Sequence, residues 1–166
     1  KISFSNSLSQ LADIKKNKIN TVKILNAVGS DGRIGKKYLS LGPMFSGPCF
    51  PRDNLAMSSY FKDSGLSGDL FQSTHKINIL QNERYLKILK KINKFQNKKI
   101  GFLGLTYKSG TDLFTDSPAF YIMNKIKPTK KNKITGYDPY FSNKIKNEFM
   151  KNHKLLIFDS LNLFIK

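Results

Sequence analysis

The second half of the chain alternates short apolar runs with helical patterns, and this alternation limits the fold of the 166 residues more than any other feature. Three runs have the length and apolar content of buried strands: IGFLGLTY (100–107), KITGYDPY (133–140) and KLLIFD (154–159). Between them, SPAFYIMNKI (117–126), which opens on a Ser-Pro pair suited to a helix N-terminus, and SNKIKNEFM (142–150) predict helices. Strand, helix, strand, helix, strand predicts a parallel sheet, so we expect an α/β domain over residues 97–166.

The first part of the chain, residues 1–96, predicts an all-helical region because its apolar residues recur at helical spacing. Asn20 is a favourable N-cap for one of its helices, and Pro51 suits the first turn of another. Four helices are predicted, over 2–16, 20–29, about 52–63 and about 69–95. The fold class that follows is α/β, with a helical region ahead of a partial Rossmann-like sheet.

The formal net charge of +18 raises the question of a nucleic-acid partner. Almost all the basic residues are lysines, which scatter along the chain and often stand beside asparagines, as in KINKFQNKK. Codons for Lys and Asn are rich in A and T, so a biased genome explains this composition. We therefore expect no nucleic-acid partner, and a basic surface that attracts anionic substrates.

Cellular location is limited by three further features. No apolar stretch approaches the roughly 20 residues of a membrane span, and no secretory signal opens the chain. A single Cys cannot form an internal disulfide, which favours a reducing, cytoplasmic setting.

The chain opens on Lys and closes without a helix terminator, so we expect it to be part of a longer protein.

That single cysteine, Cys49, lies in MFSGPCFPRDN (44–54), a Gly- and Pro-rich loop instead of an apolar run. A helix N-terminus and a nearby cation favour the reactive thiolate, and the segment from Pro51 with Arg52 offers both. Asp53 would lie in the first turn of that helix, on the side of the sulfur, where it could hold a water. Local chemistry leaves a second interpretation open, in which Cys49 packs beside phenylalanines and Asp53 is an ordinary first-turn acid.

The other residues that could carry chemistry give weaker signals. The glycines after the first predicted strand do not match the G-x-G-x-x-G dinucleotide fingerprint, and only Asp138 stands near a ribose-binding position. Lys108 at the end of that strand is a reasonable phosphate contact. His75 and His153 have no partners at ligand spacing, so no metal site is expected.

Several stretches together resemble the nucleotide-sugar 6-dehydrogenases, the UDP-glucose/GDP-mannose dehydrogenase family, and most of all its UDP-glucose type. SDGRIGKKYLSLGPMFSGPCFPRDNLAM (30–57) resembles the family's R-I-G turn and its G-G-x-C-x-P-K-D loop. INILQNERY (77–85) resembles its V-N-x-x-Q helix. IGFLGLTYKSGTDLFTDSPA (100–119) and ITGYDP (134–139) resemble its F-K-x-x-T-D-D-x-R-x-S-P turn and Y-D-P motif.

The resemblance implies an NAD-dependent enzyme that oxidises the C6 alcohol of a nucleotide sugar twice, UDP-glucose being favoured. It implies a homodimer built on a central helical domain, here 1–96, followed by a truncated nucleotide-sugar-binding domain, 97–166. Cys49 then matches the nucleophile, Asp53 the acid that positions water, and Arg52 a residue near the cofactor. Residues matching substrate contacts are Arg33, which would reach across the dimer, Tyr38, Leu39, Ser40, Leu41, Gly42, Ser46 and Lys108.

Departures from the family pattern leave room for other functions. Ser46 replaces a Gly before the Cys, and Thr115 stands where the family has an Arg. The family's N-terminal domain, which would bind most of NAD, has no counterpart here, and neither do the catalytic Lys and Asn expected on the helix just before residue 1, so we expect the chain alone to be inactive. The alternatives are an inactive dimerising scaffold and, ranked below it, a basic nucleic-acid-binding module.

Overall fold

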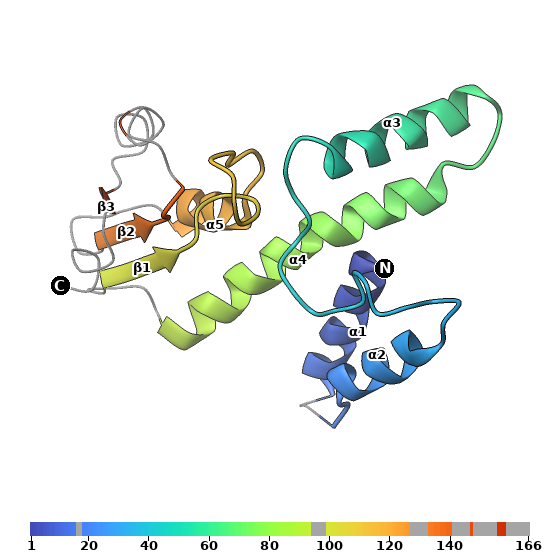
Figure 1. Ribbon diagram of the computed structural model, residues 1–166, viewed down its shortest axis with the longest axis horizontal. Coiled ribbons are helices and arrows are strands. Elements are labelled where there is room, and N and C mark those ends of the chain that lie inside the picture. The colour runs from blue at the N-terminus through green and yellow to red at the C-terminus, as the bar shows by residue number, and fades with distance from the viewer. Residues whose placement is uncertain (16–17, 94–98, 127–132, 141–146, 148–155, 159–166) are drawn as a thin grey trace. The chain divides into compact units, whose positions relative to one another are not determined.

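The computed structural model describes residues 1–15, 18–93, 99–126, 133–140, 147 and 156–158 (Figure 1). The chain divides into two compact units. A helical unit comprises Lys1–Phe45 and Pro51–Glu83, and an α/β unit comprises Ser46–Phe50 and Arg84–Lys166. The division differs from the boundary expected at residue 96, because the segment around Cys49 and the end of the longest helix group with the α/β unit.

Four helices lie where the spacing of apolar residues predicts them. They are α1 (Ile2–Ile14), α2 (Thr21–Ser30), α3 (Phe50–Asp63) and α4 (Asp69–Asn93). The Asn20 side chain caps α2 by accepting a hydrogen bond from the backbone N–H of Lys23 at 2.9 Å. α3 and α4 lie side by side (Figure 1), with the rings of Phe61 and Phe71 packed edge to face at 5.0 Å.

In the helical unit, α1 and α4 bury polar side chains and leave several apolar side chains exposed. On α1 the buried residues are Ser3, Ser5, Asn6 and Ala12. Phe4 and Leu11 are 49% and 44% exposed. α4 repeats the pattern: it buries asparagine and glutamine side chains while Leu80 is 47% exposed. Because burying amides has a cost unless they are hydrogen-bonded, these polar faces need partners within the unit.

The α/β unit contains a three-stranded parallel sheet, which confirms the α/β class. Its strands β1 (Lys99–Leu103), β2 (Lys133–Tyr137) and β3 (Leu156–Phe158) lie in the order β1-β2-β3. Ile100 pairs with Ile134, and Thr135 pairs with Leu156. The predicted helix over 142–150 and His153 lie outside the described residues, apart from position 147.

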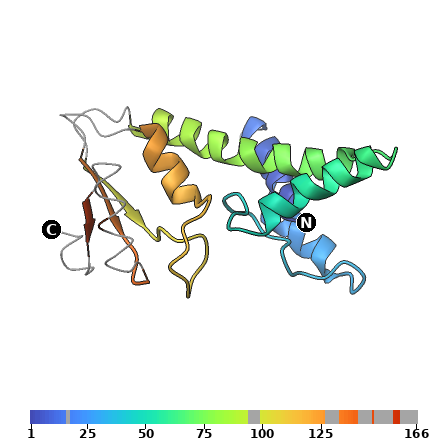
Figure 2. The same ribbon diagram turned by 90° about the horizontal axis from the view of Figure 1, so that it is seen from above.

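The helix α5 (Pro118–Ile126) begins directly after Ser117, as the Ser-Pro pair predicts, and lies alongside β1 and β2 (Figure 2). Phe120 and Met123 of α5 pack against Leu105 and Ile134, and all four are almost fully buried. This cluster is the core of the unit.

The first strand is shorter than predicted. β1 ends at Leu103 although the apolar run continues to Tyr107. Gly104 has a φ of +84°, a left-handed conformation that turns the backbone out of the strand direction. The residues that follow form a turn instead of ladder pairs.

Among the helices of the described part, none is both long and apolar enough to span a membrane.

Candidate functional site

Cys49 is exposed and lies immediately before the first residue of α3. Asp53 lies in the first turn of that helix, as predicted. Arg52 donates from Nε to the Asp53 carboxylate at 2.9 Å, and its Nη2 lies 2.8 Å from the same oxygen. Both side chains are more than half exposed, so this ion pair adds little stability and leaves both groups accessible to a ligand.

Three buried amide side chains hold the segment ahead of the cysteine. Asn78 of α4 both accepts from the N–H of Phe45 at 2.8 Å and donates to its carbonyl at 2.7 Å, as a neighbouring strand would. Gln81, one turn further on, donates to the carbonyl of Gly42 at 2.8 Å. Asn6 of α1 accepts from the N–H of Gly42 at 3.3 Å. These bonds give Asn6, Asn78 and Gln81 their partners, and they hold residues 42–45.

Sequence reasoning did not identify these three amides as part of the site. The motif INILQ places Asn78 and Gln81 three residues apart, on one face of a helix. Amides at that spacing inside a helix with apolar neighbours are the signal that could have indicated them. Their partners are backbone groups of a loop more than 30 residues away, which no local pattern specifies.

In the α/β unit, the next part of the loop contacts the turns that follow β1. Gly47 is buried, has a φ of +86°, and donates its N–H to the carbonyl of Thr115 at 3.0 Å. A Cβ added at Gly47 would lie only 2.5 Å from carbons of the Tyr107 ring. Glycine is therefore required here both by conformation and by space. Ser46 beside it is half-buried.

The predicted substrate residues of the helical unit form a mostly exposed loop. Arg33, Ser40 and Leu41 are exposed, whereas Leu39 is buried. Tyr38 is exposed and has a φ of +62°, an uncommon conformation for a non-glycine residue, and such conformations are enriched at functional sites.

Arg33 is paired within its own turn. Its Nε and Nη2 donate to both oxygens of Asp31 at 2.6 to 3.2 Å. These hydrogen bonds raise the pKa of the Arg33 guanidinium, and together with the backbone N–H of Arg33 they lower the pKa of Asp31. The pair is exposed to solvent, so Arg33 can leave Asp31 for another anion at little cost.

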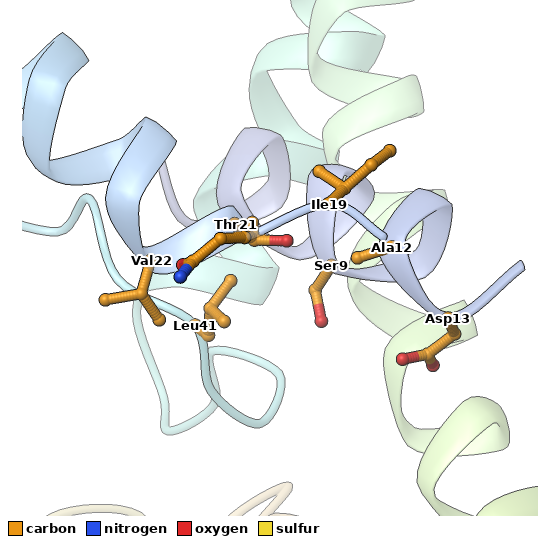
Figure 3. A pocket seen from close by; sticks show the side chains of 8 residues that line it. Ser9, Ala12, Asp13, Ile19, Thr21, Val22 and Leu41 are labelled. Carbon is orange, nitrogen blue, oxygen red and sulfur yellow. The ribbon is translucent and has the colours of Figure 1, made fainter. Parts of the chain in front are cut away.

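A pocket of about 330 Å³ opens in the helical unit between the end of α1, the start of α2 and the loop at Leu41 (Figure 3). Leu41 is the one predicted site residue on its wall. The lining residues are Ser9, Ala12, Asp13, Ile19, Asn20, Thr21, Val22 and Leu41.

In the described part of the chain, no group of three or more His, Cys, Asp or Glu side chains could hold a metal ion.

Lys108 lies in the turn after β1 and is exposed, with its Nζ 5.5 Å from the centroid of the Tyr107 ring. Asp138, at the end of β2, supports the same turn. Its Oδ2 accepts from the N–H of Leu105 at 2.7 Å and of Thr106 at 3.0 Å. The Thr106 hydroxyl lies 3.0 Å from the same oxygen, and Oδ1 accepts from the N–H of Tyr140 at 2.9 Å.

The hydrogen bonds of Asp138 determine its charge state. Burial is the largest single influence and acts to raise its pKa, but the hydrogen bonds from Thr106, Leu105 and Tyr140 together outweigh burial and lower the pKa. Both carboxylate oxygens are engaged by the protein's own donors. Asp138 is therefore a structural anion and not a free acceptor for a ribose.

Two family models match the chain, one in each half. The family model of the UDP-glucose/GDP-mannose dehydrogenase family, central domain, matches residues 1–79. The model of the UDP-binding domain of the same family matches residues 101–165.

Individual proteins give the same result. The chain is 33% identical over 162 residues to a UDP-glucose 6-dehydrogenase of Rhizobium meliloti, covering 95% of this chain and 34% of that protein. It is 35% identical over 167 residues to a UDP-glucose 6-dehydrogenase of Rickettsia felis, covering 97% of this chain and 36% of that one. The chain thus spans about a third of the length of these relatives.

Among solved structures, a UDP-glucose dehydrogenase from Pyrobaculum islandicum superposes with a TM-score of 0.84 at 24% identity. The match covers 99% of this chain and 37% of that one. A GDP-mannose dehydrogenase from Pseudomonas aeruginosa gives a TM-score of 0.67 at 19% identity, over 99% of this chain and 38% of that one. At these identities the likeness concerns the fold.

Proposed function

This chain belongs to the UDP-glucose/GDP-mannose dehydrogenase family, and we propose that it forms the central and nucleotide-sugar-binding part of an enzyme that oxidises the C6 alcohol of a UDP-sugar to a carboxylate. UDP-glucose is the proposed substrate, because both relatives named above are UDP-glucose 6-dehydrogenases. The observation that carries the proposal is the exposed Cys49 thiol at the N-terminus of α3, in a loop whose backbone is fixed by Asn78, Gln81 and Tyr107.

Cys49 serves as a covalent nucleophile in this proposal. The first oxidation removes a hydride from C6 and a proton from its hydroxyl, which gives an aldehyde. The thiolate adds to the aldehyde carbon, and loss of a second hydride from that carbon gives a thioester. Water then attacks the carbonyl, the C–S bond breaks, and the carboxylate leaves while the sulfur is restored. Asp53, four residues on and exposed, orients that water.

The substrate is an anion, and several proposed contacts are cations or backbone groups. Lys108 is exposed after β1 within the match to the UDP-binding domain, where it pairs with the substrate. Arg33 reaches the substrate after leaving Asp31. Residues 38–42 and Ser46 contact the nucleotide sugar through the loop ahead of the thiol. The excess of lysines in the chain draws the diphosphate toward the site.

NAD, when bound, accepts the hydride in each of the two oxidations. The described residues offer one contact to it: the guanidinium of Arg52 is exposed, and it can leave Asp53 for a phosphate at little cost. Asp138 does not fit a ribose contact, since its oxygens are engaged.

A homodimer is proposed from the faces that α1 and α4 expose. Phe4 and Leu11 on α1 and Leu80 on α4 are between 44% and 49% exposed, while the buried residues of both helices include the hydrogen-bonded amides of Asn6 and Gln81. Apolar helix faces of this kind are commonly covered by a partner, and a second copy brings the same faces.

The test uses the complete protein, incubated with NAD and a panel of UDP- and GDP-sugars while NADH absorbance is followed. We expect about two NADH per sugar consumed with UDP-glucose, since two hydrides leave each C6. Cys49→Ser should abolish the second NADH. The circular dichroism and melting temperature of the Cys49→Ser protein should match those of the wild type, which shows that the variant is folded.

Other outcomes favour other functions. A folded, dimeric protein that produces no NADH with any sugar favours the inactive scaffold. Steeply salt-dependent binding to arbitrary DNA or RNA favours the nucleic-acid-binding module.

A further inference from the structure

We propose that Tyr107 is a positioning residue for Cys49, because its ring sets the turn at Gly47 and with it the location of the thiol two residues later. The inference rests on the proposed function for its catalytic consequence, but its structural content is independent of any activity.

Gly47 lies in close contact with Tyr107. A Cβ at Gly47 would lie 2.5 Å from Cδ2 and Cε2 of the ring, so the glycine backbone lies directly against those two carbons. The φ of +86° at Gly47 directs its N–H to the carbonyl of Thr115 at 3.0 Å. The turn before Cys49 is therefore fixed by one aromatic edge and one hydrogen bond.

The Tyr107 backbone is itself held on both sides. Its N–H donates to the carbonyl of Leu113 at 3.0 Å, which closes the loop between the two residues. The preceding residue, Thr106, is bonded through its N–H and hydroxyl to Asp138 at the end of β2. The sheet thus fixes Tyr107, and Tyr107 fixes the turn at Gly47.

The Tyr107 ring also contacts Lys108, the cation proposed to bind the substrate. Nζ of Lys108 lies 5.5 Å from the ring centroid, within the range of a cation–π interaction. One side chain therefore touches both the turn that carries the nucleophile and the lysine assigned to the substrate. Catalysis is sensitive to such placement, since a displacement of about 1 Å can lower a rate about a hundredfold.

The first test reports the position of the thiol without any substrate. Because Cys49 is the one cysteine of the chain, a nitroxide spin label attaches there alone. We expect the label's spectrum to become more mobile in Tyr107→Ala and to stay as in the wild type in Tyr107→Phe, which keeps the ring carbons that touch Gly47. Tyr140→Ala, which removes an exposed tyrosine of the same unit, is the matched control and should change nothing.

Gly47→Ala is the second variant, in case Tyr107→Ala does not fold. Its added methyl group meets the intact ring and should release the turn, with the same gain in label mobility. An unchanged spectrum in a folded Tyr107→Ala or Gly47→Ala protein overturns the inference.

The second test uses the complete enzyme in single turnovers with UDP-glucose. A misplaced thiol should slow the second NADH by about a hundredfold while the first, which does not need the sulfur, changes little. Tyr107→Phe should restore the second step. If the wild type is active and both steps are unchanged in Tyr107→Ala, the inference is wrong and the proposed function stands. If the wild type makes no NADH but the label responds as expected, the proposed function fails and the positioning by Tyr107 holds.

Discussion

Asp138 illustrates how a residue that suggests ligand chemistry can be used for structure. In the sequence it is the one acid near a ribose-binding position. In the fold it stands 6% exposed at the end of β2 and receives hydrogen bonds from Leu105, Thr106 and Tyr140. Leu105 and Thr106 belong to the turn that carries Tyr107 and Lys108. The carboxylate therefore determines the shape of the turn beside the candidate site.

We predict that Asp138→Asn destabilises the chain by about 1–3 kcal/mol at pH 7, because buried N–H groups lose a charged acceptor and face amide hydrogens instead. The pKa of Asp138 is lowered in the folded state, so its stabilisation is present above the ordinary value near 3.9 and is lost as the pH falls through the folded-state pKa. The stability difference between wild type and variant should therefore shrink below about pH 4. Urea unfolding at several pH values measures it, and a difference independent of pH would contradict the role of the charge.

At the scale of elements, α1 and α4 act as a frame for the loop ahead of Cys49. Asn6, Asn78 and Gln81 are each at most 1% exposed and bind backbone groups of residues 42–45. A loop rich in Gly and Pro has few ladder partners of its own. The helices supply those partners through side chains, which explains why their buried faces are polar.

The predicted effect of Asn78→Ala is a loss of about 1–3 kcal/mol of stability, since the N–H and carbonyl of Phe45 lose their partners. The amide of Phe45 should also exchange its hydrogen faster, which hydrogen–deuterium exchange measures. Asn82→Ala is a matched control, because Asn82 lies on the same helix, is fully buried, and has no hydrogen-bond partner in the described part of the chain. Equal loss of stability in the two variants, with unchanged exchange at Phe45, would argue against the proposal that Asn78 holds the loop ahead of Cys49.

At the scale of the whole molecule, α1 and α4 each expose apolar side chains to solvent. Gln10 and Gln81 lie within hydrogen-bond distance of each other at 3.4 Å, and the exposed Leu11 and Leu80 are their immediate neighbours in sequence. Removing such leucines from water by association contributes about 25 cal/mol per Å² of apolar surface. In the proposed homodimer, the helical unit would gain stability by covering Leu11 and Leu80 with a second copy.

We predict that Leu80→Glu shifts the protein from dimer to monomer, because a charge replaces apolar surface at the proposed contact. Sedimentation equilibrium at tens of micromolar protein should show at least a tenfold weaker dimer. Leu103→Glu, at an exposed leucine of the α/β unit, is the control and should leave the mass unchanged. A wild type that sediments as a monomer at these concentrations would rule out the homodimer for this chain.

The order of elements could be predicted from local patterns. Asn20 capping α2, Pro118 opening α5 and the three parallel strands are consequences of backbone geometry and side-chain spacing, which neighbouring residues specify. The position of Cys49 before α3 and of Asp53 in its first turn follows from the same local rules. The roles proposed for Cys49, Asp53, Arg33, Arg52 and Lys108 remain predictions, which the experiments above address.

The sequence by itself determined the helical first part, the α/β second part and the family, because periodicity and motifs are properties of short stretches. Only the tertiary structure decided which faces of α1 and α4 are buried, where β1 ends, and what holds the loop around Cys49. The residues that hold it, Asn78 and Tyr107, lie about 30 and 60 positions from their contacts at Phe45 and Gly47. Hydrogen bonds and steric contacts of that kind depend on distances in space, which arise only once the chain has folded.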